Sequence, residues 1–113
     1  MPFKVLDALD IESPNGVFRG LSGPLGVGAF KINRLELAPG AEGPEHDHLK
    51  DGQEEVYAVV GGSGAVRLDG EELPIAAGNF VYCSPEVRRQ MRAGDDGLVW
   101  VGVGAAGSAN SPG

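Results

Sequence analysis

The chain has 113 residues, a formal net charge of -7 and 42% hydrophobic residues. This length is that of a single domain, and the composition excludes a disordered chain. An acidic chain repels phosphate backbones and anionic lipid surfaces, so neither nucleic acid nor a membrane is expected as a partner. The lone Cys83 cannot form a disulfide within the chain, and we find no signal peptide and no bilayer-spanning apolar run, so we expect a cytoplasmic protein.

Short strands separated by turns are predicted along the first part of the chain. A turn cluster at 13–16 is followed by a short strand at 17–21, a loop at 22–28 and a longer strand at 29–37. The apolar phase of the longer strand slips by one residue near Asn33-Arg34. This slip predicts either a β-bulge there or apolar cover on both faces.

Turns rich in glycine divide the rest of the chain into further strands. They are expected at 54–60, 65–68, 71–75, 80–83, 87–93 and 98–103, after a short segment at 45–48. About nine short strands with no convincing helix are typical of a sandwich or barrel. We therefore predict one all-β domain over residues 1–103 and a disordered C-terminal tail over residues 104–113.

The two histidines of the chain lie two residues apart, as His46-Asp47-His48. On a strand, side chains at positions i and i+2 share a face, so both imidazoles could reach one metal ion. If this segment pairs across the turn at 50–52 with the next strand, Glu55 approaches the pair. Two histidines and one carboxylate form a facial triad, which suits Fe, Mn, Ni or Zn as a divalent ion with open positions for a ligand.

This segment resembles the first motif of the cupins, which runs Gly, five residues, His-x-His, three or four residues, Glu, six residues, Gly. Gly40 stands at the first glycine, and residues 54–64 are similar to the family's Glu-Glu-x-Tyr strand and Gly-x-Gly turn. Residues 78–85 resemble the start of the second motif. The similarity covers residues 30–103 and is closest to small single-domain bacterial conserved-barrel cupins. It implies a double-stranded β-helix, or jelly-roll barrel, that forms a homodimer.

The sequence departs from the family pattern at two places. Six residues separate His48 from Glu55, so Gln53 is an alternative ligand, whereas Glu54 should point to the opposite face. The fourth ligand of the family, a histidine in the second motif, falls on Arg89. An arginine cannot ligate a metal, and at about 5 Å it opposes a divalent cation by several kcal/mol at an effective dielectric of about 20.

Two hypotheses for the function stay open, and the sequence does not decide whether the protein is an enzyme. In the first, the barrel pocket binds a small molecule such as a carboxylate or other anion, held by Arg89 with the two imidazoles. In the second, His46, His48 and Glu55 hold the divalent metal of a dioxygenase or isomerase. Either this three-ligand site holds an ion or no ion is bound. The expected pocket residues are His46, His48, Glu55, Arg89, Tyr57 and Met91, and Phe30 and Trp100 are also expected to line the barrel.

Overall fold

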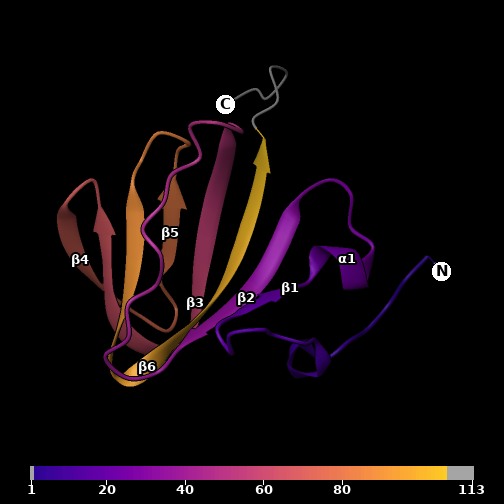
Figure 1. The fold of residues 1–113 in the computed structure, drawn as a ribbon, viewed down its shortest axis with the longest axis horizontal. Helices are drawn as coiled ribbons and strands as arrows, with labels where there is room; N and C mark the ends of the chain where they lie inside the picture. The colour runs from indigo at the N-terminus through magenta and orange to yellow at the C-terminus, as the bar shows by residue number, and fades with distance from the viewer. Residues whose placement is uncertain (1, 107–113) are drawn as a thin grey trace.

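The chain folds into a curved antiparallel sheet, seen in a computed structural model that describes residues 2–106 (Figure 1). Its strands are β1 (Phe18–Gly20), β2 (Lys31–Leu37), β3 (Gln53–Leu68), β4 (Glu71–Ala76), β5 (Phe80–Cys83) and β6 (Arg89–Ala106). A 3-10 turn at Ala8–Asp10 and the single turn of helix α1 (Ser22–Leu25) are the helical elements of the described range. Helix α1 falls within the predicted loop. No described helix is long and apolar enough to cross a membrane.

The strands are ordered β1-β2-β6-β3-β4, and β5 pairs with β3 beside this path. The long strands β3 and β6 lie side by side at the centre (Figure 1). The barrel closes where the irregular segment between β2 and β3 crosses to β6, through bridges from Glu42 to Arg92 and from His46 to Arg89. The predicted all-β jelly-roll barrel is confirmed.

The glycines predicted to end strands lie inside β3 and β6 and bend both strands together. The register between the two strands shifts between Val59 and Gly61 and again between Gly62 and Gly64. Gly62 has a φ of 73°, and a Cβ there would lie 2.0 Å from the carbonyl oxygen of Gly97. A side chain therefore cannot fit, and glycine allows the close backbone approach that a curved sheet needs. Fewer and longer strands result than the turn signals predicted.

Strand β2 pairs with β6 without interruption, from Lys31 opposite Gly104 to Leu37 opposite Leu98, so the predicted β-bulge is wrong. The apolar phase slips because a polar residue, Asn33, occupies an inward position, and the strand itself alternates regularly.

Two expectations at the ends of strands also need correction. Phe30 was expected to line the barrel, but it precedes β2 and is 39% exposed. Strand β6 continues to Ala106, so residues 104–106 belong to the sheet and not to a tail. The rest of the predicted tail, residues 107–113, lies outside the described residues.

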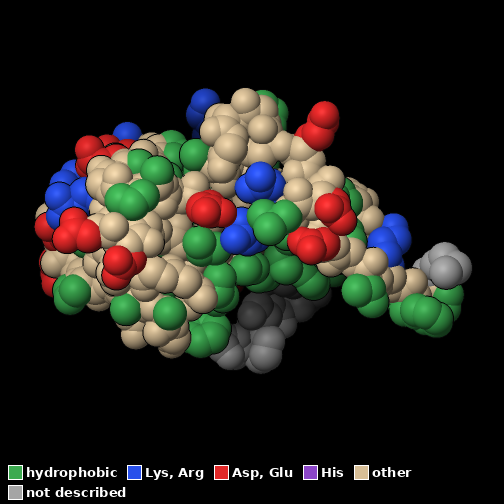
Figure 2. All heavy atoms as spheres, turned by 90° about the horizontal axis from the view of Figure 1, so that it is seen from below, with side chains coloured by type: hydrophobic (Ala, Val, Ile, Leu, Met, Phe, Trp, Pro, Cys, Tyr) green, Lys and Arg blue, Asp and Glu red, His purple; other side chains and the backbone are tan. Residues whose placement is uncertain are grey.

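The closed core fills one part of the barrel and continues into the wall of a cavity. Leu98, Val66 and Cys83 are at most 1% exposed, and a fully buried leucine or valine side chain contributes about 1.5–3 kcal/mol of transfer free energy. Tyr57, Met91 and Trp100 belong to the same buried cluster. On the face shown in Figure 2, acidic and basic side chains are interspersed with hydrophobic ones. The described side chains on that face thus form no continuous basic stripe of the kind that binds nucleic acid.

Candidate functional site

A cavity of about 570 Å³ opens beside the core, a volume that suits a small-molecule ligand. All six side chains predicted for the pocket line this cavity: His46, His48, Glu55, Tyr57, Arg89 and Met91. Their burial differs, because the Arg89 side chain is 1% exposed and that of His46 is 41% exposed. The cavity therefore has a buried polar end that reaches toward the core and a rim open to solvent.

The histidine segment reaches the site by a different route from the one predicted. It does not pair with β3 across the turn, because at Glu55 both edges of β3 are occupied, by Gly104 of β6 and by Cys83 of β5. Instead, the backbones of His46 and Arg89 exchange two hydrogen bonds, of 3.0 and 2.9 Å. The expected strand pairing is wrong, and barrel closure is what brings the imidazoles to Glu55.

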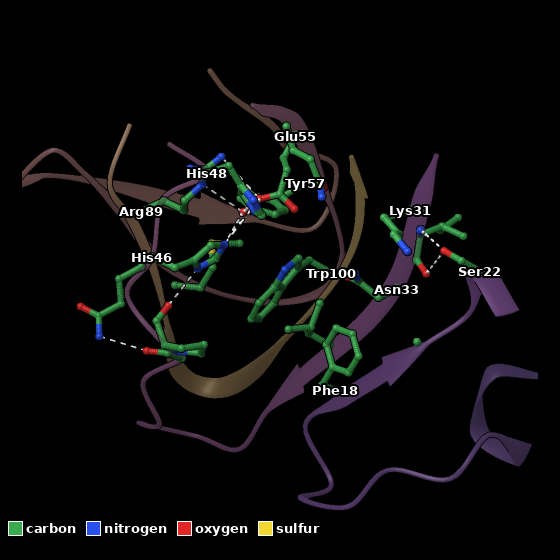
Figure 3. A pocket seen from close by; sticks show the side chains of 18 of the residues that line it. Phe18, Ser22, Lys31, Asn33, His46, His48, Glu55, Tyr57, Arg89 and Trp100 are labelled. Carbon is green, nitrogen blue, oxygen red and sulfur yellow. Dashed lines mark hydrogen bonds and ion pairs between the residues drawn. The ribbon is translucent and has the colours of Figure 1, made fainter. Parts of the chain in front are cut away.

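The carboxylate of Glu55 stands at the centre of the polar cluster (Figure 3). Its Oε1 atom lies 3.1 Å from Nε2 of His48 and 3.5 Å from Nε2 of His46. The ligand atoms of these three residues all lie within 4.8 Å of one another, so together they could hold a metal ion.

Neither alternative to Glu55 occupies this position. The carboxylate of Glu54 accepts a hydrogen bond from the hydroxyl of Tyr82 on the outer face of the sheet. Gln53 lines the cavity, but its amide donates to Asp51 at 3.1 Å. Alternation along β3 therefore excludes Glu54, and the bond to Asp51 holds the amide of Gln53 away from the two imidazoles.

An acceptor stands behind each imidazole ring and orients it. Nδ1 of His48 lies 2.9 Å from Oδ1 of Asp51, and Nδ1 of His46 lies 3.4 Å from the carbonyl oxygen of Pro44. An oxygen beside Nδ1 calls for an N–H there, which turns Nε2 toward the cavity. Histidines that bind metals are held in this way. Asp51 is a positioning residue that the sequence reasoning missed, because it treated the residue as part of a turn.

Arg89 is a buried cation with one unsatisfied nitrogen. Its Nε donates to the hydroxyl of Tyr57 at 3.2 Å, and Nη1 donates to the carbonyl of Val87 at 2.6 Å. Nη2 lies 3.4 Å from Oε1 of Glu55, within ion-pair distance, but it makes no hydrogen bond with the described residues. Buried guanidinium groups normally use all their N–H groups, so this nitrogen lacks an acceptor.

The charges of the cluster keep Glu55 ionised. Burial acts to raise the pKa of the carboxyl group, but hydrogen bonds from His46 and Tyr57, with the charges of His48 and Arg89, lower it overall. The hydrogen bond to Glu55 raises the pKa of His46 against the opposing effect of desolvation. Burial, and then the bond to Glu55, raise the pKa of Tyr57, so its hydroxyl stays a donor. The site thus combines a carboxylate with a fixed cation and two imidazoles.

The opposite side of the cavity carries a second group of polar side chains. Figure 3 shows Phe18 and Trp100 between the imidazole cluster and the side of the cavity where Lys31 and Asn33 lie. Trp100 lines the cavity, as predicted. Phe18 also lines it, whereas Phe30, which was expected there, does not. The sequence did not predict that Lys31 and Asn33 line the cavity, because only the pairing of β2 with β6 shows which residues of β2 face inward.

Comparison with known proteins agrees with this fold and these motifs. The sequence pattern of the family described as "Cupin domain" matches residues 33–104. The chain therefore belongs to the cupin family. Comparison with curated proteins gave no match.

Several solved structures share the fold. A cupin protein from Bacteroides fragilis is 22% identical with a TM-score of 0.79, over 100% of this chain and 90% of that one. A Cupin 2 conserved barrel domain protein from Salinispora arenicola is 25% identical with a TM-score of 0.74, over 96% and 91% of the two chains. A predicted oxalate decarboxylase from Thermotoga maritima is 21% identical with a TM-score of 0.76, over 91% and 99%. At such identities, the chemistry of the site has to be argued from the residues of this chain.

Proposed function

We propose that this cupin binds a small carboxylate in its barrel cavity and that Arg89 anchors the carboxylate. The observation that carries this proposal is Nη2 of Arg89, a residue that lines the cavity: this buried nitrogen has no hydrogen-bond acceptor among the described residues. A carboxylate matches the charge and the planar donor pattern of a guanidinium group. A ligand carboxylate beside Nη2 would satisfy this nitrogen.

The charge balance of the cluster supports an anion despite the acidity of the whole chain. Glu55 is the one carboxylate within 4 Å of Arg89 among the described residues. The hydrogen bond to Glu55 raises the pKa of His46, which favours the positively charged form of its imidazole, and Lys31 also lines the cavity. The cavity therefore offers at least as much positive as negative charge, in a setting where burial strengthens charge interactions.

Thermal unfolding with sodium benzoate, against sodium chloride at equal ionic strength, tests this proposal. A ligand at about ten times its Kd stabilises the folded state by about 1.4 kcal/mol. For a domain of this size, that corresponds to a rise in Tm of about 5 °C. Arg89→Met should abolish the rise. Arg88→Met is the matched control, because Arg88 is exposed and pairs with Glu45 and Asp47 outside the cavity.

The proposal fails if benzoate leaves the Tm of the wild type unchanged, or if Arg89→Met shows the same rise. Arg89→Lys guards against a variant that does not fold, since it keeps the buried charge but loses the planar donor pair. It should bind benzoate more weakly than the wild type while unfolding cooperatively without ligand.

A second candidate function, a metal-dependent enzyme of dioxygenase or isomerase type, is favoured by the geometry of the triad. His46, His48 and Glu55 would hold the ion, and their orientation by Pro44 and Asp51 suits that role. A bound ion would supply a Lewis acid for a substrate oxygen. Arg89, in place of a fourth ligand, would weaken binding by charge repulsion.

Elemental analysis of protein incubated with Ni(II) and then desalted tests the second candidate. We expect about one ion per chain in the wild type, as one three-ligand site predicts, and loss of that ion in His46→Ala. Arg89→Gln should retain nickel at lower free concentrations, because the opposing charge is gone. A nickel content far below one per chain that His46→Ala does not change would rule out this candidate.

We also propose that two copies of the chain form a homodimer through the outer face of the sheet. Phe80 is 75% exposed there, beside Tyr82 at 57%, Val56 at 39% and Val103 at 36%. Two chains of charge -7 repel each other, so contact is favoured at this apolar patch, where Glu54 is bonded to Tyr82. Light scattering after size exclusion should give a dimer mass for the wild type and a monomer mass for Phe80→Asp. A monomeric wild type would refute the proposal.

A cytoplasmic location is proposed on the evidence of the free thiol. Cys83 is buried and unpaired in the core. Such a thiol is typical of a reducing compartment. Thiol titration of the unfolded protein from its native source should find one reactive thiol per chain, and a blocked thiol would argue against this location.

A further inference from the structure

We propose that Lys31 and Asn33 form a second anion subsite in the cavity, so that the ligand is a flat dicarboxylate with its two acid groups at opposite ends. This inference rests on the proposed binding of a carboxylate at Arg89. It adds the class of ligand and a residue that determines specificity.

The register of three strands places Lys31 across the cavity from Glu55. Lys31 of β2 lies opposite Gly104 of β6, and Gly104 lies opposite Glu55 of β3. The three residues form one row on the inner face of the sheet. Two strand spacings separate the outer members of the row, so the backbones of Lys31 and Glu55 are about 10 Å apart.

A second row repeats this arrangement, and both rows have glycine in the middle. Asn33 lies opposite Gly102, and Gly102 lies opposite Tyr57. A Cβ at Gly102 would lie 2.9 Å from Oδ1 of Asn33, and a Cβ at Gly104 would lie 3.0 Å from Cγ of Glu55. The middle strand therefore adds no side chain of its own between the two polar ends, and side chains of the flanking strands lie close over both glycines. The body of a ligand would lie above them, in the cavity.

The walls beside this glycine floor are aromatic and apolar. Trp100 is 3% exposed and Phe18 is 44% exposed, and both line the cavity together with Leu35 and Met91. Figure 3 shows both rings between the two polar groups of the cavity. Aromatic walls favour a flat, unsaturated body, which stacks against a ring at little cost in conformational entropy.

Lys31 and Asn33, the polar side chains across the cavity from Glu55, have no ion-pair or side-chain hydrogen-bond partner within the described part of the chain. The ammonium group of Lys31 forms no ion pair there, whereas the exposed Arg88 and Arg92 each pair with a carboxylate. The Asn33 amide likewise makes no side-chain hydrogen bond there. Both groups line the cavity. An ammonium and an amide together can bind a carboxylate, which pairs with the charge and accepts both sets of N–H donors.

Calorimetric titration with three aromatic acids tests the second subsite. Benzoate carries one carboxylate, terephthalate carries two at opposite ends of the ring, and phthalate carries two that are adjacent. We expect terephthalate to bind about twofold to fivefold more tightly than benzoate, as one solvent-exposed ion pair would give. Phthalate should bind no more tightly than benzoate, because adjacent carboxylates cannot span the two ends.

Lys31→Gln identifies the residue responsible. It should reduce the affinity for terephthalate to that for benzoate and leave benzoate binding unchanged. Lys50→Gln is the matched control, because it removes the same charge from an exposed turn that does not line the cavity. It should leave all three affinities unchanged. Without a local subsite, the acidity of the chain would disfavour a dianion, so non-specific attraction does not explain the expected result.

The outcomes separate this inference from the proposed function. If benzoate does not bind the wild type, the proposed function and this inference fail together. If benzoate binds through Arg89, but terephthalate binds no more tightly or Lys31→Gln does not weaken it, the second subsite is refuted and the proposed function stands.

Discussion

The inner and outer faces of β3 carry the same pair of residue types in different surroundings. Glu55 and Glu54 are neighbours on this strand, and each accepts a hydrogen bond from a tyrosine hydroxyl, of Tyr57 on the inner face and of Tyr82 on the outer face. The Glu55 side chain is 11% exposed and also contacts both imidazoles and Arg89. Glu54 is exposed, and Tyr82 is its one hydrogen-bond partner among the described residues.

The difference shows that alternation along a strand decides which of two adjacent carboxylates becomes part of a site. A buried hydrogen bond to a charged group contributes more to stability than an exposed one, because water competes with the exposed bond. Paired substitutions on the two faces should therefore differ in their effects on the free energy of unfolding.

The largest difference is expected between two apolar residues of β6. Leu98→Ala should lower the free energy of unfolding by about 3 kcal/mol, because it leaves a cavity in the core where Leu98 is 1% exposed. Val103→Ala, at an outer position that is 36% exposed, should cost less than about 1 kcal/mol. Urea unfolding followed by circular dichroism measures both. Equal losses would mean that the inner face is not a packed core.

The two carboxylates of β3 should differ by a smaller amount. Glu55→Gln should cost about 2 kcal/mol, because the nearly fully buried guanidinium of Arg89 loses its counter-charge. Glu54→Gln should change stability by less than about 0.5 kcal/mol. The same urea experiment applies at neutral pH. A neutral effect at Glu55 would contradict the central place given to its carboxylate.

The two tyrosine hydroxyls should show a smaller difference still. Tyr57→Phe removes the donor to Glu55 and the acceptor for Nε of Arg89, at a cost of about 1 kcal/mol. Tyr82→Phe removes a bond that is exposed in the single chain, so at protein concentrations where a dimer dissociates it should cost less than Tyr57→Phe. If Tyr82→Phe were the more harmful change under those conditions, the hydroxyl of Tyr57 would not hold the buried cluster together.

Ionisation of the two phenols gives a test by pH. Burial, followed by the bond to Glu55, raises the pKa of Tyr57 above its ordinary value of 10.0, and the bond to Glu54 raises that of exposed Tyr82. The stability that these two raised pKa values contribute is therefore complete below pH 10.0, the ordinary value. It is lost as the pH rises from there through the pKa values of the two tyrosines in the folded state. Ultraviolet absorption of phenolate should show Tyr82 ionising first. In Tyr82→Phe, phenolate should form only as the chain unfolds, and earlier ionisation would show that Tyr57 is accessible.

The sequence predicted the parts of the site that depend on short spacings. His46, His48 and Glu55 lie within one motif, and Arg89 is found by counting along a second one. Partners on distant strands could not be predicted in this way. The pairing of β2 with β6 decides that Lys31 and Asn33 face the cavity, and neither residue stands in a recognisable motif.

Local signals were also ambiguous where one residue type serves two purposes. The glycines at 61–64 and 94–97 resemble hairpin turns in sequence, but in the structure they bend continuous strands. A glycine with a positive φ serves a turn and a bulge equally well, so its spacing does not show whether the strand ends. Asp51 stands in a turn signal for the same reason, although its carboxylate orients His48.

The most direct test of carboxylate binding is a crystal structure of the protein with 4-bromobenzoate, whose bromine is located by anomalous scattering. We expect the carboxylate within about 3 Å of Nη2 of Arg89. The bromine should lie between Phe18 and Trp100 and point toward Lys31. A carboxylate bound elsewhere, with Nη2 of Arg89 still lacking an acceptor, would contradict this account.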